Sequence, residues 1–431
     1  MSLALAVVVI SGLLLFGVSG EYQNGDGRDP APLEDGSRYG EESPGTLVFL
    51  MDVTPRMAKA YIDLQRAGVL WFQIMNSRFP GRFANYLVGA IKEQGPPTLS
   101  VSFNFIDFLL DIQDLELEMA VDDCDSPVLA TVLSALNSGA LSRNSVVFAL
   151  TRARSRDAEL QEEIIRKAVE IGVQINFLLP ESPEEGSGDV CGDPQWHVVY
   201  DNVAMGTGGA LLNSRTTSLD QLLTSYSPNR VDAQLVVDEE LENCNQPGQA
   251  AAFVPVDSST SELVVEVPQF GTPYEGVDVS IQRPNGSSPT NVNQLVKSQV
   301  YQVGVTPQDA GTWRVGVFAR NAGACRLRVW ARSSLRISVG FSHSPVSPLA
   351  RYYPAPPRGR INYLLAGVRA LSPIVLTAEG ERTLLRRRTG QFQFHSDKPF
   401  ECPANGLAEV VIRGFDSQTI LPVQMTKHVI C

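Results

Sequence analysis

Histidine and cysteine are both scarce in this sequence. The 431 residues include four histidines and six cysteines, and no two cysteines have the Cys-x-x-Cys spacing of a zinc site. The sequence also lacks a Gly-x-Ser-x-Gly turn, a His-Glu-x-x-His helix and a Walker loop. These absences argue against zinc binding and against common hydrolase and nucleotide chemistry. We therefore expect a protein that is not an enzyme and uses no cofactor.

Long apolar runs are also missing after residue 20. Met1–Gly20 has a short apolar core followed by small residues, which predicts a secretory signal peptide and not a membrane span. The even number of cysteines suits an oxidising compartment. The net charge of -12 is spread along the chain and argues against nucleic acid. We expect a secreted, extracellular protein with no transmembrane segment and no nucleic-acid partner.

The pattern of apolar residues divides the remaining chain into modules. Residues 21–44 are rich in Gly, Asp, Glu and Pro and predict a disordered lead-in. Over residues 45–240, buried-strand patterns alternate with helical ones, which predicts an α/β domain with a doubly wound parallel sheet. After a linker at 241–249 the pattern changes to short alternating strands. This pattern predicts two small β-sandwich modules, at 249–342 and 360–431.

The expected elements of the α/β domain follow from the same patterns. Strands are predicted at 46–52, 99–106, 146–150, 173–179 and 210–212. Helices are predicted at 57–79, 83–93, 128–137, 158–171, 198–205 and 219–224.

Two of the predicted strands end in polar residues. Asp52 and Thr54 follow the first strand, and Thr151 and Arg152 follow the strand that ends at residue 150. In an open α/β sheet, ligands bind beside the carboxyl ends of the parallel strands. We therefore expect these side chains to share one edge of the sheet and to form the binding site.

The two strand ends resemble the von Willebrand factor A domain, and its hemicentin branch in particular. In that family the first strand ends in Asp-x-Thr-x-Ser and the fourth in Thr-Asp. Asp52, Thr54 and Thr151 match these motifs, whereas Arg56 stands at the serine position and Arg152 at the second aspartate. The family's residues surround a divalent cation that bridges to an acidic group on a partner. The resemblance to the hemicentin amino-terminal region runs from about residue 45 to the end of this chain.

The two arginines change what this edge is expected to bind. Magnesium prefers oxygen ligands, whereas a guanidinium offers only donors and stays charged. A guanidinium about 5 Å from a divalent ion opposes its binding by roughly 6 kcal/mol at an effective dielectric constant near 20. We therefore predict no bound metal and an ion pair of Asp52 with Arg56 or Arg152. A partner's carboxylate or sulfate would then contact a guanidinium directly.

The resemblance also suggests how the cysteines pair. Cys124 follows Asp123 in a loop that resembles the family's Asp-Cys-Pro stretch, and Cys191 lies in a Cys-Gly-Asp that the family shares. Both loops are expected on the strand-end edge, so Cys124 is expected to pair with Cys191. Two further disulfides would close the β modules, Cys244 with Cys325 and Cys402 with Cys431. Six cysteines allow fifteen pairings, so the connectivity stays open.

Two surface features suggest further contacts. Asn285 begins an Asn-Gly-Ser sequon in a turn and is predicted to carry a glycan. Arg386, Arg387 and Arg388 suggest a basic face for sulfated glycans, although a solvated charge run is the commoner explanation of such a cluster.

These features predict a secreted, non-catalytic extracellular matrix or cell-adhesion protein. Its expected partner is an extracellular protein or sulfated glycan with acidic groups. The predicted contact residues are Asp52, Thr54, Arg56, Asp123, Thr151 and Arg152. The alternative is a structural module that assembles with other copies of itself and binds no ligand at this edge.

Overall fold

The structure of the chain is a computed structural model. It describes residues 44–430 except for 94, 119–123, 181–196, 214–218, 222, 225–226, 269–273, 297–299, 344–361, 370–373, 379–382, 388–392, 404–406 and 417–418. The expected signal peptide, and the lead-in up to residue 43, lie outside the described residues.

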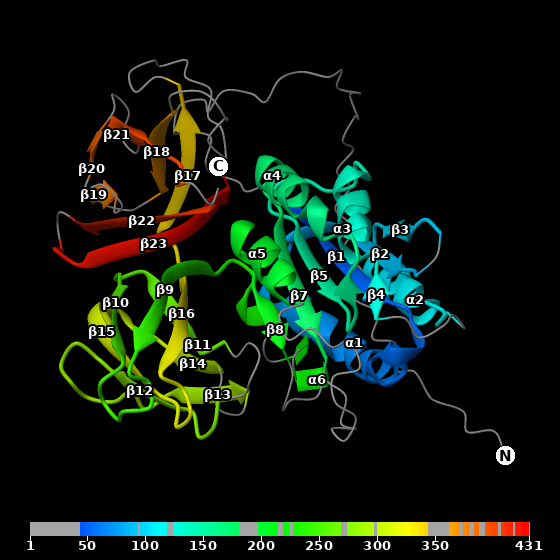
Figure 1. The fold of residues 1–431 in the computed structure, drawn as a ribbon, viewed down its shortest axis with the longest axis horizontal. Helices are drawn as coiled ribbons and strands as arrows, with labels where there is room; N and C mark the ends of the chain where they lie inside the picture. The colour runs from blue at the N-terminus through cyan, green and yellow to red at the C-terminus, as the bar shows by residue number, and fades with distance from the viewer. Residues whose placement is uncertain are drawn as a thin grey trace, which may run out of the picture.

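A six-stranded sheet with the order β3-β2-β1-β5-β7-β8 forms the α/β domain (Figure 1). All neighbouring strands are parallel except β3, which runs antiparallel to β2 at one edge. The strands are β1 (Gly45–Asp52), β2 (Phe83–Ile91), β3 (Thr98–Ser102), β5 (Val146–Leu150), β7 (Gln174–Leu179) and β8 (Leu211–Asn213). This topology confirms the predicted doubly wound α/β fold.

Helices cover both faces of this sheet, so β1 is buried along its whole length. Leu47 and Phe49 of β1 pack on the side of α1, α2 and α6, and Val48 and Leu50 pack on the side of α3, α4 and α5. The helices are α1 (Ala58–Arg78), α2 (Phe105–Gln113), α3 (Val128–Asn137), α4 (Gln161–Ile171), α5 (Val198–Gly206) and α6 (Leu219–Gln221). None of the helices in the described ranges has the length and apolar character that a membrane span needs.

Two predicted elements are wrong. The helix predicted at 83–93 is strand β2, which pairs in parallel with β1. The strand predicted at 99–106 ends at residue 102, and the chain turns into helix α2, which was not predicted. Asn104 starts this helix, because its side chain accepts a hydrogen bond from the main-chain N–H of Asp107 at 3.0 Å. A short apolar run fits a helix or a buried strand equally well, and here the pairing with β1 decides.

The first β module consists of two sheets, with the orders β10-β15-β12 and β13-β14-β11-β16-β9. Strand β9 pairs with β16, so it belongs to this module although residues 234–240 fall within the range expected for the α/β domain. Trp313 lies in the module's core with no exposed surface. The strands are β9 (Gln234–Glu242), β10 (Ala251–Val256), β11 (Thr260–Glu266), β12 (Asp278–Gln282), β13 (Val292–Val296), β14 (Val300–Gly304), β15 (Gly311–Phe318) and β16 (Ala324–Ser333).

The second β module is built on strands in the order β17-β18-β21-β20-β19-β22-β23. Strand β17 pairs with β18 and so lies in this module, although it falls within the range expected for the first. The strands are β17 (Arg336–Ser342), β18 (Asn362–Arg369), β19 (Ile374–Ala378), β20 (Thr383–Arg387), β21 (Gln393–Phe400), β22 (Leu407–Asp416) and β23 (Pro422–Ile430).

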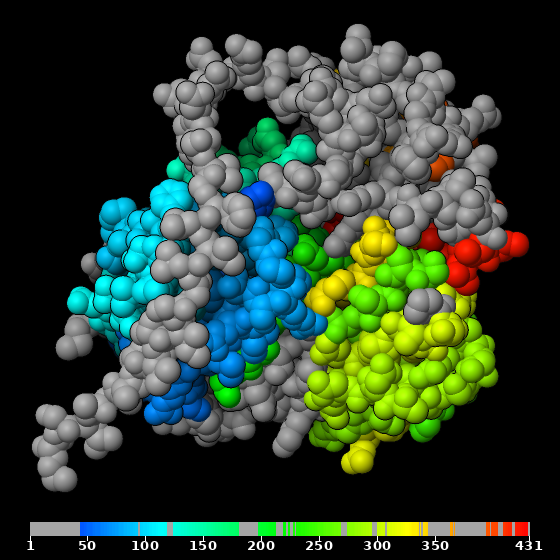
Figure 2. Space-filling model, turned by 180° about the vertical axis from the view of Figure 1, so that it is seen from behind, coloured from blue at the N-terminus to red at the C-terminus, as the bar shows by residue number. Residues whose placement is uncertain are grey.

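The three modules pack against one another. Trp330 of β16 is fully buried in the same apolar cluster as the α1 face of the α/β domain. Figure 2 shows the blue segments of the α/β domain lying directly against the yellow-green first β module. Strand β23 crosses onto β9, where the side chains of Gln424 and Thr426 donate to the carbonyl oxygen of Val236 at 2.8 and 2.9 Å. Helices α4 and α5 also lie beside β23, so the α/β domain contacts both β modules at a shared junction.

Candidate functional site

The end of β1 places Asp52 at the carboxyl edge of the sheet, where its carboxylate is fully buried. Its Oδ1 accepts a hydrogen bond from the main-chain N–H of Thr54 at 3.0 Å. Its Oδ2 accepts one from the hydroxyl of Thr151, at the end of β5, at 2.8 Å. The structure thus brings together the two strand ends that the sequence pointed to. Burial raises the pKa of the Asp52 carboxyl, although these hydrogen bonds partly oppose that shift.

The predicted ion pair of Asp52 with an arginine is not found among the described residues. Nη1 of Arg152 instead approaches the carbonyl oxygen of Arg56 at 3.4 Å. Nη1 of Arg56 lies 3.4 Å from the sulfur of Cys124. Both arginines are partly exposed as residues, whereas Asp52 is fully buried, so pairing would require burying a second charge. The hydroxyl of Thr151 and main-chain N–H groups satisfy the carboxylate instead.

A short basic segment follows Thr151 on the same edge. Arg154 lies on β6 (Arg154–Ser155), which pairs with β4 (Asp125–Ser126), and its guanidinium contacts both carboxylate oxygens of Asp125 at 2.5 and 2.7 Å. Arg156, two residues further, is exposed. Neither Arg154 nor Arg156 was among the predicted contact residues. The alternating pattern Arg-Ala-Arg-Ser-Arg over 152–156 is the signal that would have found them.

Hydrogen bonds with buried groups hold residues 152–157 in place. The main-chain N–H of Ala153 donates to the hydroxyl of Thr151 at 3.0 Å. The carbonyl oxygen of Ala153 accepts a hydrogen bond from the hydroxyl of Tyr200, on α5, at 2.8 Å. Asp157 accepts from the first N–H groups of α3, including that of Ala130 at 2.5 Å. These contacts fix the backbone from which the arginines project.

The described residues of this edge do not fit a divalent cation. Both oxygens of Asp52 already accept hydrogen bonds, and Arg56 and Arg152 bring donors where the cation-binding family has oxygen ligands. No group of three or more His, Cys, Asp or Glu residues in the described part of the chain is arranged to hold a metal ion. Asp123 lies outside the described residues.

The structure describes one of the three predicted disulfides completely. Cys244 and Cys325 form the predicted bond, with their Cα atoms 6.0 Å apart. Cys124 and Cys402 are each disulfide-bonded as well. Their predicted partners, Cys191 and Cys431, lie outside the described residues.

The two surface features of the sequence are only partly described. Asn285 lies in an exposed turn, where its side-chain oxygen accepts hydrogen bonds from the main-chain N–H and the hydroxyl of Ser287 at 2.9 and 2.7 Å. The glycan at Asn285 stays a prediction. The side chains of Arg386, Arg387 and Arg388 lie outside the described part of the structure.

Comparison with known proteins identifies one part of the chain. The sequence profile of the von Willebrand factor A domain matches residues 46–216. No curated protein matches the chain.

Several solved structures are similar to parts of this chain. A conserved hypothetical protein, BatB from Bacteroides thetaiotaomicron, is 15% identical with a TM-score of 0.29, and the match covers 43% of this chain and 98% of that one. The pilus adhesin SpaC from Lactobacillus rhamnosus GG is 6% identical with a TM-score of 0.33, covering 90% and 50%. Proximal thread matrix protein 1 from the mussel byssus is 12% identical with a TM-score of 0.32, covering 47% and 50%. At these TM-scores the similarities carry no argument about function.

Proposed function

Because residues 46–216 form a von Willebrand factor A domain, we propose that this chain is a secreted, non-catalytic adhesion or matrix protein. It binds an acidic partner at the carboxyl edge of the parallel sheet, without a metal ion. The finer resemblance to the amino-terminal region of hemicentins is part of the same proposal. The observation that carries it is the basic edge itself, where Arg152, Arg154 and Arg156 follow the buried Asp52–Thr151 pair.

The chemistry of this edge favours direct recognition of an anion. Both oxygens of the buried Asp52 carboxylate accept hydrogen bonds within the chain, so Asp52 presents no carboxylate to a partner or a cation. A guanidinium can bind a carboxylate or a sulfate through two parallel N–H···O hydrogen bonds. Arg154 makes this kind of contact with Asp125 within the chain. An acidic group on an extracellular protein or a sulfated glycan would be held at Arg152 and Arg156 in the same way.

The test is charge reversal on the edge of the full chain. Immobilised heparin and an immobilised poly-glutamate peptide serve as probes, with and without a chelator. We expect binding that the chelator leaves unchanged, that weakens with salt, and that Arg152→Glu and Arg156→Glu each reduce at least tenfold. Arg166→Glu on the exposed side of α4 is the matched control and should bind like the wild type. Unchanged binding in Arg152→Glu, or binding that needs magnesium, would refute this mechanism.

A second candidate function, self-assembly, is favoured by an apolar patch on the α/β domain. Phe103, Ile106 and Leu110 are 75%, 67% and 49% exposed, and β3 beside them pairs, among the described strands, with β2 alone. Strand β3 has the sequence TLSVS and carries no charge that would discourage edge pairing. A second copy of the chain could therefore add its own β3 in antiparallel register.

Sedimentation velocity at rising concentration separates the two functions. Self-assembly predicts a concentration-dependent dimer that Phe103→Lys abolishes. Phe253→Lys is the control, because Phe253 is 64% exposed on the first β module. A monomer at all concentrations would leave acidic-partner binding as the function.

A further inference from the structure

Two consecutive residues of α5 contact different parts of the molecule. The hydroxyl of Tyr200 donates to the carbonyl oxygen of Ala153, in the segment that follows β5. The carboxylate of Asp201 accepts two hydrogen bonds, both at 2.9 Å, from the guanidinium of Arg328 on β16. Neighbouring residues of a helix point about 100° apart, so one helix can contact the binding edge and the first β module at once.

On the side of the binding edge, a short series of hydrogen bonds connects α5 to Asp52. Tyr200 holds the carbonyl oxygen of Ala153 at 2.8 Å, and the N–H of Ala153 donates to Thr151 at 3.0 Å. Thr151 in turn donates to Asp52 at 2.8 Å. Tyr200, Thr151 and Asp52 have no exposed surface, so water does not replace these contacts when one is strained.

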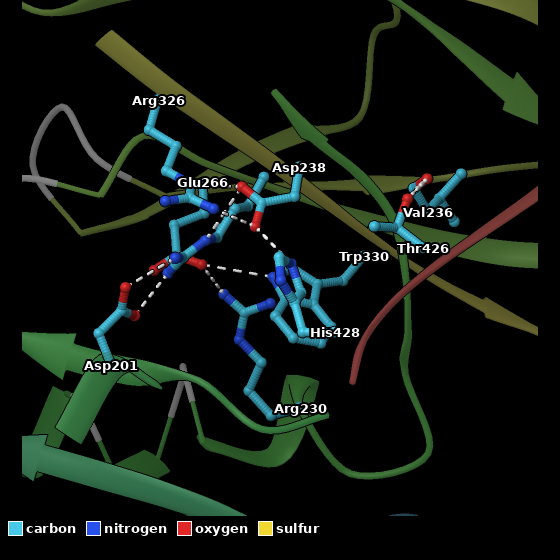
Figure 3. Close-up of polar contacts among 10 residues, drawn as sticks. Asp201, Arg230, Val236, Asp238, Glu266, Arg326, Trp330, Thr426 and His428 are labelled. Carbon is cyan, nitrogen blue, oxygen red and sulfur yellow. Dashed lines mark hydrogen bonds and ion pairs between the residues drawn. The ribbon is translucent and has the colours of Figure 1, made fainter. Parts of the chain in front are cut away.

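On the other side, a largely buried ionic cluster joins the three modules (Figure 3). Arg328 is fully buried between Asp201 of the α/β domain and Asp238 of β9, whose Oδ1 lies 3.4 Å from its Nε. Asp238 also contacts Arg326 at 2.6 Å and Nε2 of His428, on β23, at 3.0 Å. Figure 3 shows Asp201, Asp238 and His428 converging from three different elements. Glu409 on β22 is the cross-strand neighbour of His428.

The charges in this cluster depend on one another. Burial alone would lower the pKa of Arg328, but Asp201 and Asp238 hold it above its ordinary value. Removing one partner of a buried ion pair leaves an uncompensated charge, which is strongly destabilising. Removing one member of the cluster therefore weakens the junction, and Asp201 connects the cluster to α5.

We propose that α5 couples the binding edge to the docking of the two β modules. Loosening the junction frees Asp201, and through Tyr200 it loosens the backbone of residues 151–157. By reciprocity, a partner that fixes this backbone tightens the junction. The inference rests on the proposed function only in taking this edge as the binding site.

Hydrogen–deuterium exchange of the full chain, with no partner present, tests the coupling. Asp238→Asn perturbs the far end of the path, and we expect the amide of Ala153 and its neighbours to exchange about fivefold faster or more. In the Tyr200→Phe background, which keeps the ring stacked on Phe177, the same substitution should add nothing at Ala153. Arg78→Gln is the control, because it breaks a different contact between the modules, with Glu262 at 3.0 Å. It should leave Ala153 unchanged.

The contrary result is faster exchange in β9 and β23 with unchanged exchange over 151–157, which would overturn the coupling. If Asp238→Asn does not fold, His428→Gln removes a single contact of the same cluster and must move Ala153 in the same direction. Because no partner is used, the outcome is independent of whether Arg152→Glu abolishes binding to heparin or poly-glutamate.

Discussion

Oδ2 of Asp238 lies 3.0 Å from Nε2 of His428, and this contact joins the first strand of the first β module to the last strand of the second. The two residues are 190 positions apart, and both are buried. The same carboxylate faces Arg326 and Arg328. Asp238 is therefore the point at which the charges of the junction are balanced, and its protonation state should control how firmly the modules dock.

We expect Asp238→Asn to destabilise the protein at neutral pH by about 3 kcal/mol, because Arg328 would keep a buried charge with one partner fewer. Burial acts to raise the pKa of Asp238, but the hydrogen bond from His428 and the charges of Arg328 and Arg326 hold it well below its usual range. A lowered carboxyl pKa contributes stability above the ordinary value, and that stability is lost as the pH falls below it.

The wild type should therefore lose stability between pH 4 and pH 2 more steeply than Asp238→Asn. Urea denaturation at pH 7, 4 and 2.5 measures both curves. Asp278→Asn, at an exposed position of β12, is the control and should follow the wild type. Parallel curves for Asp238→Asn and wild type would show that this carboxylate does not control acid stability.

A second prediction concerns Lys427, which is partly buried in the second β module. Lys427 lies on the same face of β23 as the buried Val423, Met425 and Val429, and its Nζ donates to the carbonyl oxygen of Val339 at 3.2 Å. Burial lowers the pKa of Lys427 to about 8. Folding at neutral pH must therefore partly desolvate a cation, and Lys427→Met should stabilise the protein by about 2 kcal/mol.

This gain should depend on pH in a defined direction. Between the native pKa near 8 and the ordinary value of 10.5, the unfolded chain binds a proton that the native chain does not, so wild-type stability rises with pH. The advantage of Lys427→Met should be largest at pH 7 and small at pH 10. Guanidinium denaturation at both values checks this, and a constant difference would mean that the lysine is solvated.

The disulfide between Cys244 and Cys325 should contribute strongly to the first β module. It closes a loop with a sequence separation of 81, which corresponds to about 4.5 kcal/mol of lost conformational entropy (as TΔS) in the unfolded chain. Replacing both cysteines by alanine should lower the melting temperature accordingly. The comparison with the wild type is made without reductant, so that the other disulfides stay intact. A decrease of less than about 1 kcal/mol in the free energy of unfolding would contradict the entropic account.

Local patterns were sufficient to predict that the ends of β1 and β5 meet at one edge of the sheet. The apolar runs of β1 and β5 end at Asp52 and Thr151, and parallel strands place such ends together, as the 2.8 Å contact shows. The segment 83–93 was misassigned because its apolar residues fit either period, and pairing with β1 supplies the missing information. Arg328 and Asp201 are 127 positions apart, and no spacing in the sequence indicates that they meet. The ionic cluster could therefore be identified only from the structure.

The hydrogen-bond partners of Asp52 also could not be predicted from the sequence. An arginine at each of two motif positions suggested an ion pair, whereas the structure satisfies the carboxylate with Thr54 and Thr151. Which group pairs with Asp52 depends on how deeply its carboxylate is buried. A guanidinium at this position would have to be buried, whereas the threonine hydroxyl already is. Sequence patterns locate a residue at an edge but do not give its depth.

The last prediction is that divalent cations do not bind at this edge. Burial raises the pKa of Asp52, and both of its oxygens already accept hydrogen bonds, so a cation would have to displace Thr54 and Thr151 beside two arginines. A ligand that binds only the native state raises its melting temperature in proportion to the logarithm of its concentration. Titrating the full chain with magnesium, manganese or calcium to 10 mM should therefore give no saturable shift. Asp52→Asn is the matched control, because it keeps an oxygen acceptor but cannot supply a charged ligand. A saturable shift in the wild type that disappears in Asp52→Asn would mean that the edge binds a cation, and that partner recognition through guanidinium alone is wrong.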